Sequence, residues 1–211
     1  MAYVVYFILE IDLAHRPRAE MIAETRAKLL AAGRKAFGTI GYSEASMDDF
    51  TAEAGLTRGA LYHHFGDKKG LFQAVLLEID GEMTARMEAA SERAPTRWQG
   101  LVDECTAYIQ MALEPEIQRI VFQDGPAVLG DPSSWPNAGG CVAMMTASVA
   151  RLKEEGMIED IDAEAAARVI NGALGYASQW IANADDPEAV SKKAAQAFNV
   201  FLEGLRLTKP A

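Results

Sequence analysis

The sequence predicts an all-α fold in which three N-terminal helices precede a larger set of helices. Apolar residues recur at helical spacing from about residue 22 onward, and Ser, Thr or Asp stands before most of these apolar segments, as helix caps do. Beyond the first nine residues, no segment alternates apolar and polar residues as a strand would. Half of the 211 residues are hydrophobic, which is enough for a substantial core.

The first predicted helix rests on one apolar stripe, with charged residues off that stripe. The stripe consists of Ile22, Leu29, Leu30, Gly33 and Phe37. Gly38 and Gly41 are expected to end this helix, because glycine favours helix termination.

Two short helices are expected to follow. Ser46, with Asp49 three residues later, matches the pattern of a helix-opening capping box. Gly55 then interrupts the helix where a left-handed C-cap residue is needed. Thr57 can cap the third helix, which extends to about Phe65.

The rest of the chain is predicted to be helical, except for a loop over residues 124–140 that is rich in Gly, Pro and Asp. The expected helices begin after Asp67 and Thr96, surround residues 117–122, end at Gly156, begin at Asp162, and run from near Pro187 to about Leu207. Residues 2–9 form an apolar run with no positive leader, well short of the roughly 20 residues that a membrane span needs. Residues 1–19 are therefore predicted to be a flexible N-terminal extension.

The net charge of −10 is unevenly distributed along the chain. Residues 16–75 hold nine basic and seven acidic residues, whereas residues 76–211 hold eleven basic and twenty-one acidic ones. A mildly basic N-terminal part on an acidic protein is one indication of a surface that faces nucleic acid. Cys105 and Cys141 have no metal-ligand spacing, and their apolar surroundings predict buried free thiols in a reducing cytoplasm. No metal or other cofactor is expected.

The stretch "SMDDFTAEAGLTRGALYHHFGDKKGLF", residues 46–72, combines two short helices with a tight glycine turn, which is typical of a helix-turn-helix motif. In such a motif the second helix lies in the major groove of DNA. Leu61 and Phe65 share the inward face of that helix, whereas Arg58 and Tyr62 share an outward face. Arginine can pair with guanine, and a tyrosine hydroxyl can reach a phosphate. Double-stranded DNA is therefore the predicted partner.

This stretch resembles the DNA-binding part of the TetR family of transcriptional regulators, and "TRAKLLAAGRKAFGTIGY" before it resembles the first helix of that family. The resemblance covers about residues 20–80. It implies a DNA-binding domain over residues 20–68, with its motif at 46–65, and a helical ligand-binding and dimerisation domain over residues 69–211. The DNA contacts that the resemblance implies are Ser46, Thr57, Arg58, Gly59, Ala60, Tyr62, His63, His64 and Lys68. Among them, Tyr62 and Lys68 are expected to contact the phosphate backbone of the DNA. Arg58 and His63 are expected to contact the bases and so to determine sequence preference.

Simpler roles remain open for some of these residues. Thr57 can act only as a helix cap, and His64 can be a packed structural residue. Thr51 departs from the small apolar residue that is usual in the family, and it is expected to contact a phosphate or to face solvent. His63 and His64 are adjacent and cannot share one helix face, so no zinc site is expected there.

By analogy with the family, the chain is expected to be a homodimeric repressor of a near-palindromic operator that a small molecule releases. Helices near residues 138–155 and 162–184 are expected to pair with their mates across the dimer. An apolar or aromatic effector suits a pocket of aromatic and methionine side chains with one polar contact. The candidate pocket residues are Trp98, Cys105, Tyr108, Met111, Phe122, Met144, Met145, Asn171, Tyr176 and Trp180.

The sequence also bears on two other classes of protein. An enzyme is not expected, because the sequence has no phosphate-binding glycine loop, no zinc-protease motif and no nucleophile elbow. The alternative is a helical protein–protein interaction module without DNA specificity. Such a module would lack the steep salt dependence that DNA binding shows.

Overall fold

The computed structural model describes residues 18–207, and within this range it is helical, with one isolated bridge between Ile158 and Arg206 as the only β-type pairing. The predicted all-α fold is thus confirmed for the described residues. Three N-terminal helices form what is called here the head: α2 (Arg18–Glu44), α3 (Met47–Ala54) and α4 (Arg58–Phe65). Of the predicted extension over residues 1–19, the first 17 residues lie outside the described range, and the last two begin α2.

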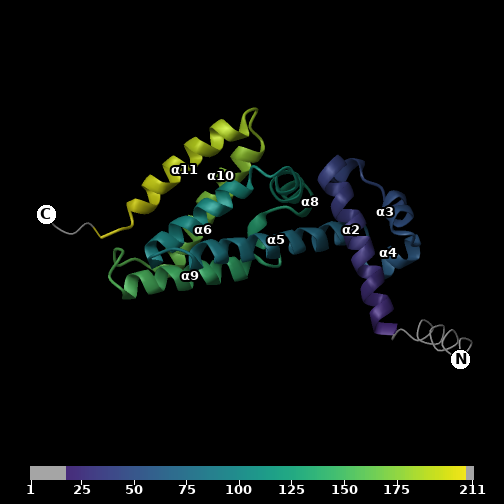
Figure 1. Ribbon diagram of the computed structural model, residues 1–211, viewed down its shortest axis with the longest axis horizontal. Helices are drawn as coiled ribbons and strands as arrows, with labels where there is room; N and C mark the ends of the chain where they lie inside the picture. Colours follow the sequence, from purple (N-terminus) through teal and green to yellow (C-terminus); the bar gives the residue numbers. More distant parts are fainter. Residues whose placement is uncertain (1–17, 208–211) are drawn as a thin grey trace, which may run out of the picture.

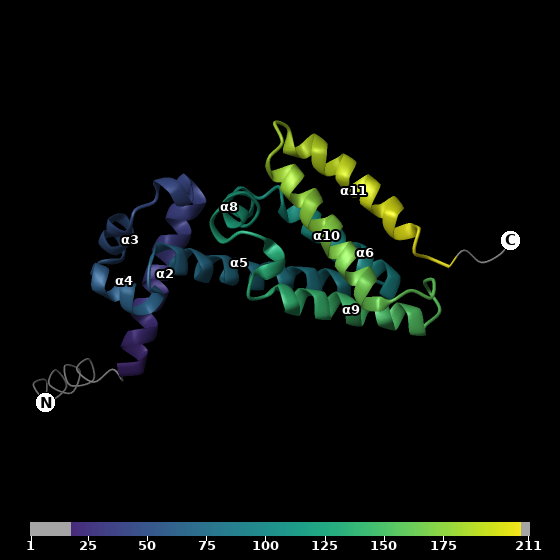
Figure 2. The ribbon, with the colours of Figure 1, turned by 180° about the vertical axis from the view of Figure 1, so that it is seen from behind.

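The long helix α5 (Lys68–Glu92) leaves the head and runs along the rest of the molecule, called here the body (Figure 1). The elements of the body are α6 (Arg97–Met111), α7 (Pro115–Ile117), the π-helix η1 (Gln118–Asp124), α8 (Gly125–Leu129), the 3₁₀ turn η2 (Pro132–Ser134), α9 (Ala138–Glu154), α10 (Ala163–Ala182) and α11 (Pro187–Glu203). Seen from behind, α10 crosses between α9 and α11 (Figure 2). The head therefore stands at one end of an elongated molecule, and α5 connects it to the body.

The predicted caps are confirmed. Each cap side chain accepts a hydrogen bond from the backbone N–H three residues further on, which satisfies one of the unpaired donors at a helix start. These caps are Ser46, Thr57, Asp67, Thr96 and Asp162. Gly55 ends α3 with φ of 64°, in the left-handed region that glycine tolerates.

Two boundaries differ from the prediction. Of the two glycines expected to end the first helix, Gly38 lies inside α2, whereas Gly41, with φ of 84°, breaks the helical path as predicted before a last turn ending at Glu44. Residues 124–140 are not a loop, since α8 and η2 occupy part of this range and α9 begins at Ala138. Pro126 and Pro132 lie in the first turns of α8 and η2, where proline is tolerated because that N–H needs no helical partner.

The head and α5 share one aromatic core. Phe37 of α2 packs edge-to-face against Phe50 of α3 and Phe72 of α5, with ring centroids 5.1 Å apart in both pairs. Leu61 of α4 is fully buried. The first turns of α5 thus help to hold α4 in place. Among residues 18–207, none of the helices combines the length and apolar character needed to cross a membrane.

Candidate functional site

The outward face of α4 is free in the described chain. Thr57 caps this helix by accepting from the N–H of Ala60 at 3.3 Å, and Leu61 fixes its inward face. Tyr62 is 51% exposed, an unusual exposure for a large aromatic side chain. Arg58, Gly59 and His63 are exposed beside it, whereas Ala60 and His64 are half-buried. The sequence-predicted recognition surface is therefore open.

The side chain of Arg58 on this surface is already paired with a carboxylate. Its Nε and Nη2 donate to the two carboxylate oxygens of Asp48 in α3. This pairing lowers the pKa of the Asp48 carboxyl below its ordinary value, chiefly through the hydrogen bond. In the free protein Asp48 therefore occupies the guanidinium that we expected to read a base.

Lys68 and Ser46 lie at the edges of the same surface. The Nζ of Lys68 donates to the backbone oxygen of Ser43 at 3.3 Å and lies 4.4 Å from the ring centroid of Tyr42. Because an ammonium group has three donors, Lys68 still has donors for a phosphate. The Oγ of Ser46 donates to Asp49 Oδ2 at 2.7 Å and accepts from the Asp49 N–H at 3.1 Å.

The expectation for Thr51 is wrong. Thr51 neither faces solvent nor points toward a DNA surface, because it is only 5% exposed. Its Oγ1 donates to the backbone oxygen of Met47 at 3.0 Å, so the hydroxyl is satisfied inside α3. A threonine can therefore replace a small apolar residue here without leaving a polar group unpaired.

The candidate ligand residues fall into two groups. Trp98, Cys105, Met111, Phe122 and Met145 are buried in the core of the body. Tyr108 and Asn171 are half-buried. Tyr108 packs edge-to-face on Phe122 at 5.8 Å, and the Nδ2 of Asn171 is buried without a hydrogen-bond partner among the described residues.

The other three candidates lie on the surface. Tyr176 is 75% exposed, Trp180 47% and Met144 39%. These three side chains are therefore not buried in the core with Met111, Phe122 and Met145. Helical spacing alone could not separate these groups, because both faces of α10 carry apolar residues.

Comparison with known proteins decides the family. Residues 29–75 match the family model described as bacterial regulatory proteins, tetR family, and residues 98–205 match the one described as Tetracyclin repressor-like, C-terminal domain. The chain belongs to the TetR family of transcriptional regulators. Members of this family regulate transcription and are not enzymes, so the prediction that this chain is not an enzyme is confirmed.

Individual TetR-family relatives support this assignment. A TetR-family regulator from Pectobacterium atrosepticum has 47% sequence identity and a TM-score of 0.84, and the match covers 92% of this chain and 100% of that one. The repressor AcnR of Corynebacterium glutamicum is 31% identical over 101 residues, 47% of this chain and 52% of its own. The repressor BepR of Brucella suis is 31% identical over 108 residues, 51% of each chain. The chain thus spans about half the length of these two repressors.

Inside the body of this TetR-family chain lies a polar group that the sequence did not point to. Asp80 of α5 is half-buried, and burial raises the pKa of its carboxyl, while a hydrogen bond with Asn137 partly offsets this effect. Burial, followed by the charge of Asp80, also raises the pKa of the Tyr108 hydroxyl and of the Cys141 thiol. Only the fold brings these residues of α5, α6 and α9 close to one another.

Replacing Asp80 with asparagine is expected to raise the free energy of unfolding at pH 7 by roughly 0.5–2 kcal/mol, the usual range for a stabilising substitution. A raised carboxyl pKa means that the ionised form weakens the fold, and the asparagine amide would stay neutral. The Oδ1 of Asn137 is buried without a partner among the described residues, and the new amide can donate to it. The gain should shrink as the pH falls toward 3.8, the ordinary pKa of the carboxyl, where Asp80 is itself protonated.

Urea unfolding at several pH values measures this gain. The exposed Asp185→Asn variant serves as the control and should leave the unfolding midpoint unchanged. A loss of stability in Asp80→Asn at pH 7 would show that the carboxylate makes favourable contacts that outweigh its burial.

Proposed function

We propose that this chain is a ligand-responsive transcriptional repressor that binds a near-palindromic operator as a homodimer and is released by a small molecule. The exposed face of α4 carries this proposal, because a guanidinium, a phenol and an imidazole stand on a helix that caps and core packing hold rigidly. The names of two relatives, AcnR and BepR, include the word repressor.

The proposed division of the chain is a DNA-binding domain over residues 20–68 and a ligand-binding and dimerisation domain over residues 69–211. The charge pattern supports the first part, and the large helical core of the body supports the second. The start of α5 takes part in the head core through Phe72, so a movement of α5 would carry the head with it.

The proposed dimer face is centred on α10. Val169, Tyr176 and Trp180 recur at seven- and four-residue spacing on its exposed side, and exposed apolar side chains in a stripe mark an association surface. Small side chains of α9, such as Ala143 and Ala147, border an adjacent groove of about 620 Å³, which suits close approach of another helix. The surface positions of Tyr176 and Trp180 therefore favour a role in dimerisation over one in the pocket.

The proposed effector site is the interior group around Tyr108 and Phe122. An apolar or aromatic molecule that enters there would replace contacts between rings and methionine side chains, which adapt readily. RolR, a structural neighbour with 20% identity and a TM-score of 0.62, was solved in complex with resorcinol, a small aromatic molecule. That neighbour shows that the same fold can hold such a molecule.

Selection of bound fragments from random DNA, with pure protein, tests the proposal. A homodimer should enrich a near-palindrome with a fixed half-site spacing.

In binding assays on the selected sequence and on unrelated DNA, Lys68→Ala is expected to weaken binding to all sequences alike. It is also expected to reduce by about one the slope of log affinity against log salt concentration. Arg58→Ala is expected to cost about 1–3 kcal/mol and to blur the preference at one base position.

Two controls accompany these variants. Arg58→Ala leaves Asp48 unpaired close to DNA, so the Asp48→Asn and Arg58→Ala double variant separates lost base contact from added repulsion. Arg151→Ala changes an exposed arginine of the body and should bind as the wild type does. Failure to enrich any sequence, together with weak salt dependence, would favour a protein–protein interaction module instead.

A further inference from the structure

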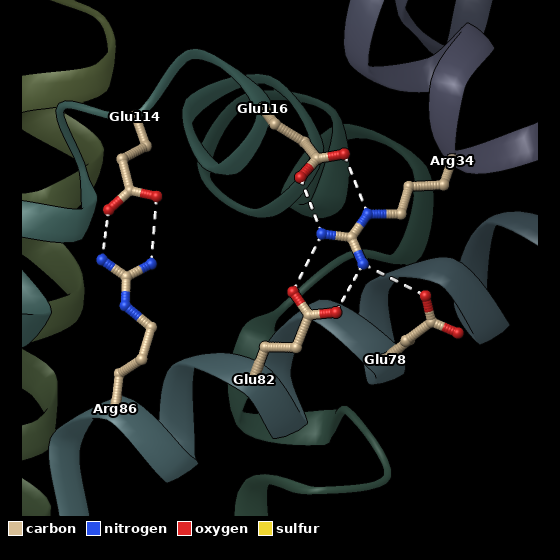
Figure 3. Close-up of polar contacts among 6 residues, drawn as sticks. All are labelled: Arg34, Glu78, Glu82, Arg86, Glu114 and Glu116. Atoms are coloured by element: carbon tan, nitrogen blue, oxygen red, sulfur yellow. Dashed lines mark hydrogen bonds and ion pairs between the residues drawn. The ribbon is translucent and has the colours of Figure 1, made fainter. Parts of the chain in front are cut away.

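Arg34 of α2 uses every N–H of its guanidinium at the junction of head and body (Figure 3). Its Nε and Nη2 donate to the two oxygens of Glu116 at 2.9 and 2.8 Å. Its Nη1 and Nη2 donate to the two oxygens of Glu82 at 2.6 and 2.8 Å, and Nη1 also donates to Glu78 at 3.1 Å. A guanidinium has five N–H donors, so none is left for another partner.

The three carboxylates belong to two different parts of the molecule. Glu78 and Glu82 lie on α5, whose first turns pack in the head core. Glu116 lies on α7, which continues directly into η1 in the body. The pairing of Arg34 with Glu116 therefore crosses from the unit formed by the head and α5 to the body, whereas the bonds to Glu78 and Glu82 stay within that unit.

The segment α7–η1 touches both the head and the body interior. The Oδ2 of Asp124 accepts a hydrogen bond from the backbone N–H of Tyr42 at 2.8 Å, just after the break at Gly41. From the same π-helix, Phe122 packs on Tyr108 in the body. A π-helix is a rare geometry that often occurs at functional sites. A shift of η1 would therefore move Asp124, which accepts the hydrogen bond from Tyr42 near the end of α2.

We propose that Arg34 is a positioning residue that, through Glu116, sets the angle at which the head leaves the body. This inference rests on the proposed DNA-binding function, since the angle matters only if two heads must meet one operator. Isolated surface ion pairs contribute little, but this guanidinium is only 24% exposed and holds three converging carboxylates in a paired geometry. Lysine would keep the charge and lose the planar fork.

The test compares Arg34→Lys and Glu116→Gln with the matched control Arg86→Lys. Arg86 also donates both terminal nitrogens to one carboxylate, that of Glu114, but it joins α5 to the residue before α7 and does not involve α2 (Figure 3). Hydrogen exchange, followed by mass spectrometry without DNA or effector, reads the junction directly. Peptides over residues 38–45 and 115–124 should exchange about tenfold faster in the two test variants, and residues 38–45 should be unchanged in Arg86→Lys.

The second readout is binding to the selected operator at several salt concentrations. Arg34→Lys should weaken operator binding about tenfold with an unchanged salt slope, because no phosphate contact is lost. Binding to random DNA should not change.

If both test variants exchange like the wild type at residues 38–45, the role of Arg34 in holding the junction of head and body is refuted. If exchange rises but operator affinity stays the same, the positioning role is refuted. If the wild type itself binds no operator, the proposed function fails separately, and with it the role of Arg34 in placing heads on DNA.

Discussion

Replacing Gly70 with alanine is expected to destabilise the head by about 3 kcal/mol and to abolish DNA binding. A β-carbon at position 70 would overlap the backbone oxygen of Phe65, the last residue of α4. Backbone cannot yield as the end of a flexible side chain can, so α4 must move away from α5. Thermal unfolding followed by circular dichroism would measure the loss, and binding to random DNA would measure the function of the head.

Gly81 of the same helix provides the matched control. It is exposed, and a β-carbon there would meet nothing within 4 Å. Since alanine favours the helix interior by up to about 1 kcal/mol over glycine, Gly81→Ala should stabilise the protein slightly and bind DNA normally. A Gly70→Ala protein with unchanged unfolding temperature would show that α4 and α5 tolerate a wider separation than the structure has.

Replacing Trp180 with aspartate is expected to raise the dissociation constant of the proposed dimer by about 100-fold. The substitution removes apolar area from the exposed stripe of α10 and places an unpaired charge in an interface that would exclude water. Sedimentation velocity at micromolar concentration would report monomers. Operator affinity should fall with dimerisation, whereas weak binding of single heads to random DNA should remain.

The control for this change is Ile40→Asp, an equally exposed apolar position of α2 at 48% exposure, far from α10 along the chain and located in the head. It should not affect the sedimentation of the dimer. A Trp180→Asp protein that still sediments as a dimer would move the interface to another surface, such as the exposed Val200 and Phe201 of α11. A wild-type protein that sediments as a monomer would refute the homodimer.

Local chemistry made much of the fold predictable. Caps such as Ser46 and Thr57 act within one turn of the chain, so their spacing is visible in the sequence. The π-helical turn at 118–124 has no such signal, because its geometry depends on packing against α2 and α10. Pro126 reads as a loop residue unless the position of the helix start is already known.

The sequence predicted the exposed face of α4, but it did not predict the residue pairs that meet through tertiary packing. The outward face of α4 follows from a four-residue period, and Arg58 and Tyr62 are indeed on it. Asp80 and Asn137 are 57 positions apart in numbering and meet only through tertiary packing, as do Arg34 and Glu116. On α10 burial follows helical spacing, at Ala167, Ile170, Leu174, Ser178 and Ile181. The exposed face also carries large apolar side chains, Tyr176 and Trp180, so apolar character alone does not mark the buried side.

The ion pair between Arg58 and Asp48 has a consequence for discrimination between DNA sequences. If Arg58 reads a base, that base must attract the guanidinium more strongly than Asp48 does, since the pair must open first. On a wrong sequence Arg58 can stay where it is, and no contact is gained there. Asp48 would then compete with the DNA for the Arg58 side chain, and only a well-matched half-site would bind the guanidinium strongly enough to displace Asp48.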